Sequence, residues 1–169
     1  VECGVWRGGI SAAMAEALGN NRTYYLFDSF EGLPPAKEID GETAINWQKK
    51  TDAPNYYNNC AAEIEWATKA MKLSAATNYK IIKGWFCDTL PDFDKNESIA
   101  ILRLDGDWYD STMECLTNLY PLVVQGGIIL IDDYLAWDGC SRAVHDYLSR
   151  NNLSCRIKQY NNGNLHYII

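Results

Sequence analysis

Two short apolar runs, each followed at once by carboxylates, constrain the fold of this chain most strongly. The runs are IAILRL, at residues 99–104, and GGIILI, at residues 126–131. Continuously apolar runs of this length are typical of strands in a parallel sheet that is covered by helices on both faces. The chain is therefore predicted to be an α/β protein with a buried, mostly parallel sheet.

The rest of the chain alternates strand-like and helix-like segments, as a sheet with crossover helices requires. We expect strands at residues 1–5, 23–27, 79–83, 98–104 and 127–131, and helices at 10–18, 60–73, 111–119 and 140–150. Residues 154–159 and 165–169 are expected to close the sheet as an antiparallel pair, because the asparagines and glycine at 161–164 tolerate positive φ. The 169 residues then make up a single domain.

Charge and hydropathy exclude several classes of partner. The chain has 15 Lys and Arg residues against 22 Asp and Glu residues, a net charge of −7, and no basic run. This balance argues against binding to nucleic acid or to an anionic membrane. No apolar run approaches the ~20 residues of a membrane span, and no signal peptide opens the chain, so we expect a cytoplasmic protein. Because Val1 lies inside a predicted strand, we also expect an upstream segment to be missing.

The six cysteines show no spacing typical of a zinc site or of a disulfide framework. They are Cys3, Cys60, Cys87, Cys115, Cys140 and Cys155. None belongs to a CxxC pair, and a chain of this length does not need disulfides for stability. We therefore expect free, buried thiols, as in proteins of a reducing cytoplasm.

Residues 31–59 interrupt the alternation of strands and helices. The segment contains three prolines and mixed charges, and its aromatic residues include Trp47, Tyr56 and Tyr57. It is longer than an ordinary connection between a strand and a helix. Two interpretations stay open: a surface excursion, or a lid or substrate wall above the carboxyl edge of the sheet, where open α/β folds bind ligands. In the second case the three aromatic side chains would stack on a sugar or on an aromatic group.

A glycine-containing turn follows the first predicted strand and leads into a helix. Gly4 and Gly8 allow a ligand to approach the backbone closely, although the spacing is not the GxGxxG of dinucleotide-binding proteins. Asp28 ends the second strand 20 residues after Gly8, the separation at which an acidic residue accepts hydrogen bonds from ribose. Together these features favour an adenosine ligand, while a solvated Asp28 stays the alternative.

Aromatic residues near the ends of the second and third strands have two interpretations each. Phe30 either lies against an adenine ring or packs in the core. Gly84 and Trp85 follow the third strand, where they either close one side of a base pocket or simply pack. The residues alone do not decide between these roles.

The strongest constellation is a set of carboxylates behind the two apolar runs. Asp105 and Asp107 follow the first run, and Asp132 and Asp133 follow the second. If adjacent parallel strands end level with one another, these groups meet at the carboxyl edge of the sheet, where a divalent cation relieves their repulsion. The alternative is a row of strand-end caps facing water. Asp110 is expected to cap the next helix.

Five runs of sequence resemble one enzyme family in order and spacing. They are ECGVWRGG, LFDSFEGLP, KGWFCDTLP, LRLDGDWYDST and GGIILIDDYLAWDGCSRAVHDY. On these runs the chain resembles the macrocin O-methyltransferase family, which comprises S-adenosylmethionine-dependent class I methyltransferases, including enzymes that methylate deoxysugars of antibiotics. The resemblance implies a Rossmann-like class I methyltransferase fold: a mostly parallel seven-stranded sheet with a terminal antiparallel hairpin and helices on both faces.

The resemblance also implies roles for individual residues. Those implied to bind S-adenosylmethionine are Glu2, Gly4, Gly8, Asp28, Ser29, Phe30, Gly84, Trp85 and Asp105. Those implied to hold Mg²⁺ are Asp105, Asp132 and Asp133, and Asp107 matches the residue proposed as general base. Family members usually carry a further region before the first strand, which helps to form the acceptor pocket.

These roles imply a magnesium-dependent O-methyltransferase that acts on a sugar hydroxyl of a glycosylated small molecule, with a homodimer left open as its assembly. Two alternatives remain. A metal-dependent glycosyltransferase is one, because an Asp-x-Asp pair after a strand can hold the metal of a nucleotide sugar. A non-catalytic or truncated methyltransferase-fold binding domain is the other.

Overall fold

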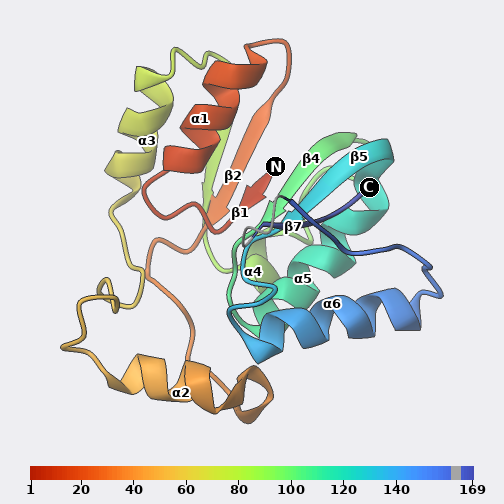
Figure 1. Ribbon diagram of the computed structural model, residues 1–169. Helices are drawn as coiled ribbons and strands as arrows, with labels where there is room; N and C mark the ends of the chain where they lie inside the picture. Colours follow the sequence, from red (N-terminus) through yellow and green to blue (C-terminus); the bar gives the residue numbers. More distant parts are fainter. Residues whose placement is uncertain (161–164) are drawn as a thin grey trace.

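The strands of this protein form one mixed sheet, shown in Figure 1. The computed structural model describes residues 1–160 and 165–169. The strand order is β3-β2-β1-β4-β5-β7-β6. β1 to β5 pair in parallel, whereas β7 is antiparallel to both β5 and β6. The predicted seven-stranded, mostly parallel sheet with a closing antiparallel pair is therefore confirmed.

The bounds of the elements follow the predicted alternation. The strands are β1 (Glu2–Cys3), β2 (Tyr24–Asp28), β3 (Tyr79–Lys83), β4 (Ile99–Leu104), β5 (Val123–Ile131), β6 (Lys158–Gln159) and β7 (His166–Ile168). The helices are α1 (Gly9–Leu18), α2 (Gly41–Lys49), α3 (Ile64–Leu73), α4 (Phe86–Thr89), α5 (Tyr109–Leu119) and α6 (Asp138–Arg150), with the 3-10 helices η1 (Glu38–Asp40) and η2 (Tyr120–Leu122). The expected turn at 161–164 lies outside the described residues.

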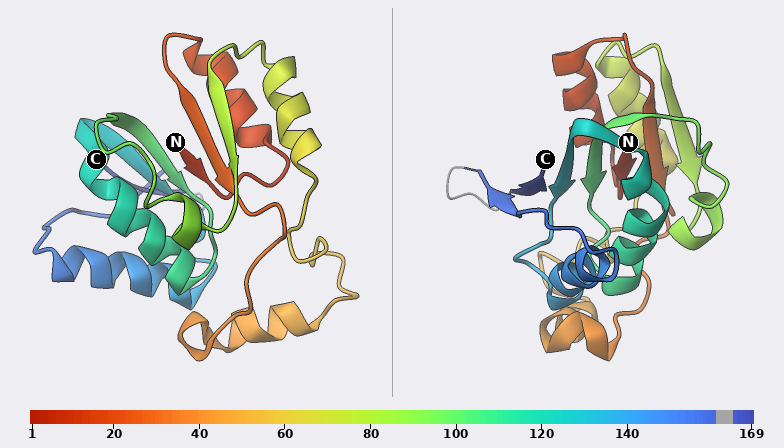
Figure 2. Two further views of the ribbon diagram at one scale, coloured as in Figure 1. Left: turned by 180° about the vertical axis from the view of Figure 1, so that it is seen from behind. Right: turned by 90° about the vertical axis from the view of Figure 1, so that its right-hand side faces the viewer.

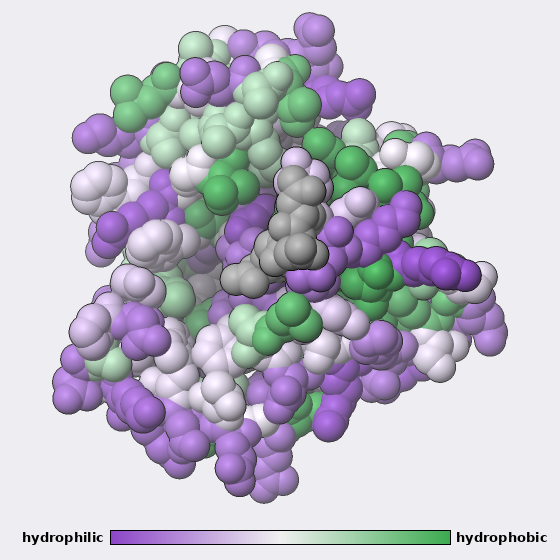
Figure 3. All heavy atoms as spheres, in the orientation of Figure 1, coloured by the Kyte–Doolittle hydropathy of each residue, from purple (hydrophilic) through white to green (hydrophobic). Residues whose placement is uncertain are grey.

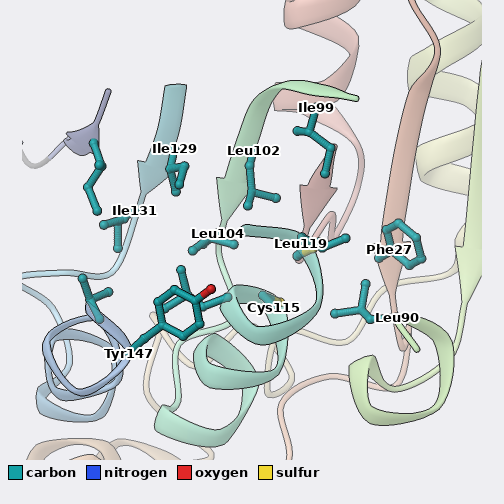
Figure 4. Packing of buried hydrophobic residues seen from close by; sticks show 14 of the residues in the cluster. Phe27, Leu90, Ile99, Leu102, Leu104, Cys115, Leu119, Ile129, Ile131 and Tyr147 are labelled. Atoms are coloured by element: carbon teal, nitrogen blue, oxygen red, sulfur yellow. The ribbon is translucent and has the colours of Figure 1, made fainter. Parts of the chain in front are cut away.

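Helices cover both faces of the sheet, as predicted (Figure 2). Successive residues of a strand point to opposite faces, so β2 supplies both cores. Leu26 packs with Ala67 and Met71 on the face that carries α1 and α3. Phe27 belongs to the larger core on the other face, where residues of β4 and β5 pack against α5 and α6 (Figure 4).

Several sequence-based expectations need correction. Two strands are shorter than expected: β1 is Glu2–Cys3 instead of residues 1–5, and β6 is Lys158–Gln159 instead of residues 154–159. The helix predicted at 60–73 begins at Ile64, because residues 57–60 have positive φ and form turns instead. β5 begins at Val123, before the glycine pair where its start was expected. Asp110 does not cap α5, because the helix begins at Tyr109 and Asp110 already lies in its first turn.

The segment expected as an excursion contains η1 and α2, and α2 lies beyond the carboxyl ends of the strands (Figure 1). Its outward surface, at the bottom of Figure 3, is mostly hydrophilic. Asp40 anchors the segment, since its buried carboxylate accepts hydrogen bonds from the backbone N–H of Tyr109 at 2.7 Å and of Lys37 at 2.7 Å. The start of α5 is therefore capped from this segment.

The thiols are free, as expected, but they are not all buried. Cys3, Cys115 and Cys140 are buried, whereas Cys87 is exposed. Among the described residues, no helix combines the length and the apolar character needed to cross a membrane.

Candidate active site

A cavity of about 820 Å³ opens at the carboxyl ends of the central strands. Its lining includes Gly4 after β1, Asp28 at the end of β2, Gly84 after β3, and Asp105 and Asp107 after β4. This is the edge at which open α/β sheets bind ligands. A cavity of this size is within the range of small-molecule and cofactor sites, which is roughly 300–1,000 Å³.

The turn after β1 depends on glycine at its first position. Gly4 has φ 87°, and a Cβ added there would overlap the backbone carbonyl of Asp105. Only glycine therefore lets the end of β1 pass so close to the end of β4. The following Trp6 also has positive φ, at 48°, and its ring lines the cavity.

Asp28 fixes the same turn through its carboxylate. Oδ2 accepts hydrogen bonds from the backbone N–H of Val5 at 2.7 Å and of Trp6 at 2.8 Å. Oδ1 accepts one from the backbone N–H of Phe30 at 2.6 Å. A carboxylate offers about four lone-pair positions. Three are used within the protein, so Oδ1 retains one for a ligand in the cavity.

The residues expected to bind a cofactor separate into two groups. Those that line the cavity are Gly4, Asp28, Ser29, Gly84, Trp85 and Asp105. The structure places Glu2, Gly8 and Phe30 behind this lining. Phe30 packs in the α1–α3 core, and Gly8 is the N-cap of α1, against Ala67 of α3. These residues support the cavity from behind.

Arg103 holds the buried Glu2 and two of the aspartates expected as metal ligands. It lies opposite Glu2 in the register of β1 and β4, on the sheet face away from Leu102 and Leu104. Its Nη1 lies 2.6 Å from Glu2 Oε1 and 2.8 Å from Asp105 Oδ2, and its Nη2 lies 3.1 Å from Asp132 Oδ1.

This arrangement shifts the pKa values of the buried groups. Burial raises the pKa of Glu2 although Arg103 opposes the shift. Burial disfavours the charged form of Arg103, but the surrounding carboxylates outweigh it and raise the pKa of the guanidinium. Arg103 is therefore a permanent positive charge beneath the cavity.

The structure brings Asp105, Asp107 and Asp133 together, with a carboxylate oxygen of each within 4.8 Å of the other two. The backbone N–H of Asp107 also donates to Asp133 Oδ2 at 3.1 Å. Asp132, expected in the same set, is instead paired with Arg103. The N–H of Asp132 still bonds to the carbonyl of Leu104 at 3.0 Å, whereas the carbonyl of Asp133 already closes the turn to Trp137 at 3.1 Å, so the chain changes direction between the two side chains.

The clustered carboxylates strongly disfavour one another's ionised forms. Burial, and then the negative charges of its neighbours, raise the pKa of Asp107 to about 7 and that of Asp133 to about 9. Burial also raises the pKa of Asp105, against the effect of Arg103. One buried and two half-buried carboxylates that repel one another are a donor set suited to a hard divalent cation. These residues therefore fit a magnesium ion.

An aromatic cluster connects the aspartates to the α2 segment. Trp137 Nε1 donates to Asp107 Oδ1 at 2.7 Å. The Trp137 ring lies 5.2 Å from that of Trp108 and 5.9 Å from that of Trp47, both edge-on. Trp108 Nε1 in turn donates to the carbonyl of Pro34 at 2.9 Å. Residues 32–37 line the cavity, so this part of the segment is a wall of the site.

Sequence reasoning missed several residues of the site. Arg103 was detectable, because it is the one charge in an apolar strand. Asp40, Cys60 and Trp137 have no such signature, since their places depend on how distant segments meet. Cys60 lines the cavity, and burial followed by the nearby aspartates raises the pKa of its thiol to about 12.

Comparison with known proteins gives a consistent result. The sequence profile of the macrocin-O-methyltransferase (TylF) family matches residues 1–167. A relative from Streptomyces olivaceus, 8-demethyl-8-(2,3-dimethoxy-alpha-L-rhamnosyl)-tetracenomycin-C 4'-O-methyltransferase, is 37% identical over 164 residues, which cover 94% of this chain and 61% of the relative. Demethyldecarbamoylnovobiocin O-methyltransferase from Streptomyces niveus is 35% identical, covering 89% of this chain and 58% of the relative.

A solved structure supports the same likeness. The O-methyltransferase NovP superimposes with a TM-score of 0.79 and 30% sequence identity, over 99% of this chain and 69% of that chain. The chain spans about three fifths of the length of the two curated relatives, 61% and 58% respectively.

Proposed function

Because this chain belongs to the macrocin-O-methyltransferase family, we propose that it is the core of an S-adenosylmethionine- and magnesium-dependent O-methyltransferase that acts on a sugar hydroxyl of a glycosylated small molecule. The Streptomyces olivaceus relative, whose name specifies O-methylation of a rhamnosyl compound, supports the substrate class. We further propose that residues 1–169 form a single methyltransferase domain in which the 31–59 segment is a substrate wall.

The observation that carries this proposal is that one cavity contains both a turn suited to adenosine, formed by Gly4 and Asp28, and the acidic cluster. Gly4 and Asp28 would place the ribose, and Gly84 and Trp85 would flank the adenine. Asp105 lines the same cavity and belongs to the acidic cluster. The methyl donor and the acceptor oxygen would therefore meet beside Asp105 and Asp107, as a displacement reaction requires.

When bound, the sulfonium cofactor supplies an electrophilic methyl group, and the carbon–sulfur electron pair stays on sulfur as the new carbon–oxygen bond forms. The acceptor hydroxyl must lose its proton in this step. Asp107 is the group that we assign to take it. Burial, the largest cause, raises the pKa of Asp107 above its ordinary value, which makes it a stronger base than an ordinary carboxylate.

Asp105, Asp132 and Asp133 are the residues that we assign to the magnesium ion. Asp105 and Asp133 lie in the acidic cluster, and Asp132 adjoins Asp133 in the chain but is paired with Arg103. When bound, the cation lowers the pKa of an oxygen that it contacts, which helps a weakly acidic sugar hydroxyl to ionise.

Calorimetry and a transfer assay test this function. We expect S-adenosylhomocysteine to bind, and methyl-labelled S-adenosylmethionine to label a rhamnosylated acceptor with free hydroxyls only in the presence of magnesium. Asp107→Asn should lower turnover by roughly 10²–10⁴-fold with unchanged S-adenosylhomocysteine affinity. Asp94→Asn, at an exposed loop position, is the matched control.

Each outcome bears on a separate part of the proposal. Absence of S-adenosylhomocysteine binding would overturn the methyltransferase assignment, and binding of a nucleotide sugar instead would favour a glycosyltransferase. Full turnover by the Asp107→Asn variant would overturn only the assignment of the base.

A further inference from the structure

Asp107 occupies a fixed backbone position, but its side chain needs a separate support. The residue has φ 58°, in the left-handed region, and its N–H is bound by Asp133. These features place the Cα and Cβ atoms. They do not fix the rotation of the carboxylate, which decides which oxygen faces the cavity.

The indole of Trp137 supplies this support. Its N–H donates to Asp107 Oδ1 at 2.7 Å, within the range of hydrogen bonds strengthened by a charged partner. An indole nitrogen only donates, so this contact assigns Oδ1 as an acceptor. A proton taken from a substrate is then expected at Oδ2.

Trp137 is itself held on three sides. Its backbone N–H donates to the carbonyl of Asp133 at 3.1 Å, so a single tight turn carries both the Asp133 carboxylate and the indole. Its ring meets Trp108 and Trp47 at interplanar angles of 67° and 61°, and Trp108 is buried. A ring confined in this way cannot follow a moving carboxylate, so it orients the carboxylate instead.

We propose that Trp137 is a positioning residue for proton transfer: it fixes the Asp107 carboxylate through Oδ1 and thereby presents Oδ2 to the acceptor hydroxyl. This inference rests on the proposed function and deepens it. Trp137 touches neither the hydroxyl nor the methyl group in this scheme, and it acts only through Asp107.

Trp137→Phe tests the proposal, because it keeps a ring in the cluster and removes the N–H. We expect kcat to fall about 10-fold, a part of the roughly 10²–10⁴-fold contribution of a positioned base. KM for the acceptor and the S-adenosylhomocysteine Kd should stay within about two-fold. Trp66→Phe is the control, since that half-exposed ring lies on α3 against Arg7 and Lys69.

A double-mutant cycle separates positioning from a structural effect. In an Asp107→Asn background, Trp137→Phe should change kcat by less than about two-fold, because the group it acts through is gone. An equal loss in both backgrounds, or an unchanged kcat in the single variant, overturns the proposal. If Trp137→Phe does not fold, benzothienylalanine at 137 replaces the N–H with sulfur at nearly constant shape.

One readout does not depend on activity. The indole N–H resonance of Trp137, assigned by its loss in Trp137→Phe, should shift in Asp107→Asn, whereas that of Trp66 should not. Absence of turnover by the wild-type chain would overturn the proposed function, while the resonance still reports on the contact. An unshifted Trp137 resonance overturns the inference even where turnover is found.

Discussion

The three hydrogen bonds that Asp28 accepts from backbone N–H groups make it the most informative residue to perturb. Its carboxylate joins the turn after β1 to the end of β2 through Val5, Trp6 and Phe30. Asp28→Asn keeps the size of the side chain but replaces one oxygen with an NH₂ group. That group cannot accept a hydrogen bond, and it would face a backbone donor.

The size of the stability loss in Asp28→Asn depends on which of the two carboxylate oxygens the amide oxygen replaces. The amide is expected to place its oxygen at the Oδ2 position, where two N–H groups converge, and its NH₂ against the N–H of Phe30. One hydrogen bond to a charged acceptor is then lost, which is about 1.5–3 kcal/mol of unfolding free energy. Loss of the ribose acceptor on the same atom should weaken S-adenosylhomocysteine binding by about 10-fold to 100-fold.

Urea denaturation and titration calorimetry measure the two effects separately. Asp94→Asn is the matched control, because Asp94 Oδ1 alone accepts from Asn96 N at 2.9 Å and from Asn96 Nδ2 at 2.8 Å, so an amide oxygen can replace it. Its unfolding free energy should stay equal to that of the wild type within the error of the measurement. Unchanged stability in Asp28→Asn would refute the argument that this carboxylate fixes the turn. Lower stability with unchanged affinity would refute its role toward the ribose.

Two further perturbations address the α2 segment and the acidic cluster. Asp40→Ala leaves the N–H groups of Tyr109 and Lys37 without their acceptor, so urea denaturation should show a loss of about 2–5 kcal/mol, and unchanged stability would contradict the anchoring role. The pKa values of Asp107 and Asp133 are raised to about 7 and about 9 in the folded state. Above a pH of about 4 the unfolded chain has released these protons while the folded state still holds them. The unfolding free energy should therefore fall as pH rises from about 4 to 9. Magnesium should therefore raise the melting temperature more at pH 8 than at pH 5, and equal shifts at both pH values would contradict this linkage.

The sheet was predictable because its strands carry their signature locally. The β3 bounds match the prediction, and β4 differs by one residue, because each is a short apolar segment between turns. The bounds of β6, the first strand of the antiparallel pair, were predicted less well, since this strand is only Lys158–Gln159 and is exposed. The helix-period pattern also gave no sign of α2, a short helix with a single fully buried residue, Ala44.

The candidate site was predictable in its parts but not in their assembly. Spacing along the sequence placed Asp28 and Asp105 at the same edge of the sheet, and the structure has both in the cavity lining. The sequence could not tell which of Asp132 and Asp133 faces the cluster, because that depends on the residue at which β5 ends. Trp137 acquires its role only where the turn after β5 meets the loop after β4.

The single guanidinium of Arg103 has a consequence for how such chains can change over time. It is shared by Glu2 of β1, Asp105 after β4 and Asp132 after β5. Loss of the Arg103 guanidinium would leave three carboxylates without their positive partner, and one of them, Glu2, is fully buried. Loss of any one carboxylate would change the charge balance at the other two. Substitutions accepted one at a time are therefore disfavoured here. We expect related sequences to keep or replace these four positions together, as a charge-balanced set that spans the centre of the sheet.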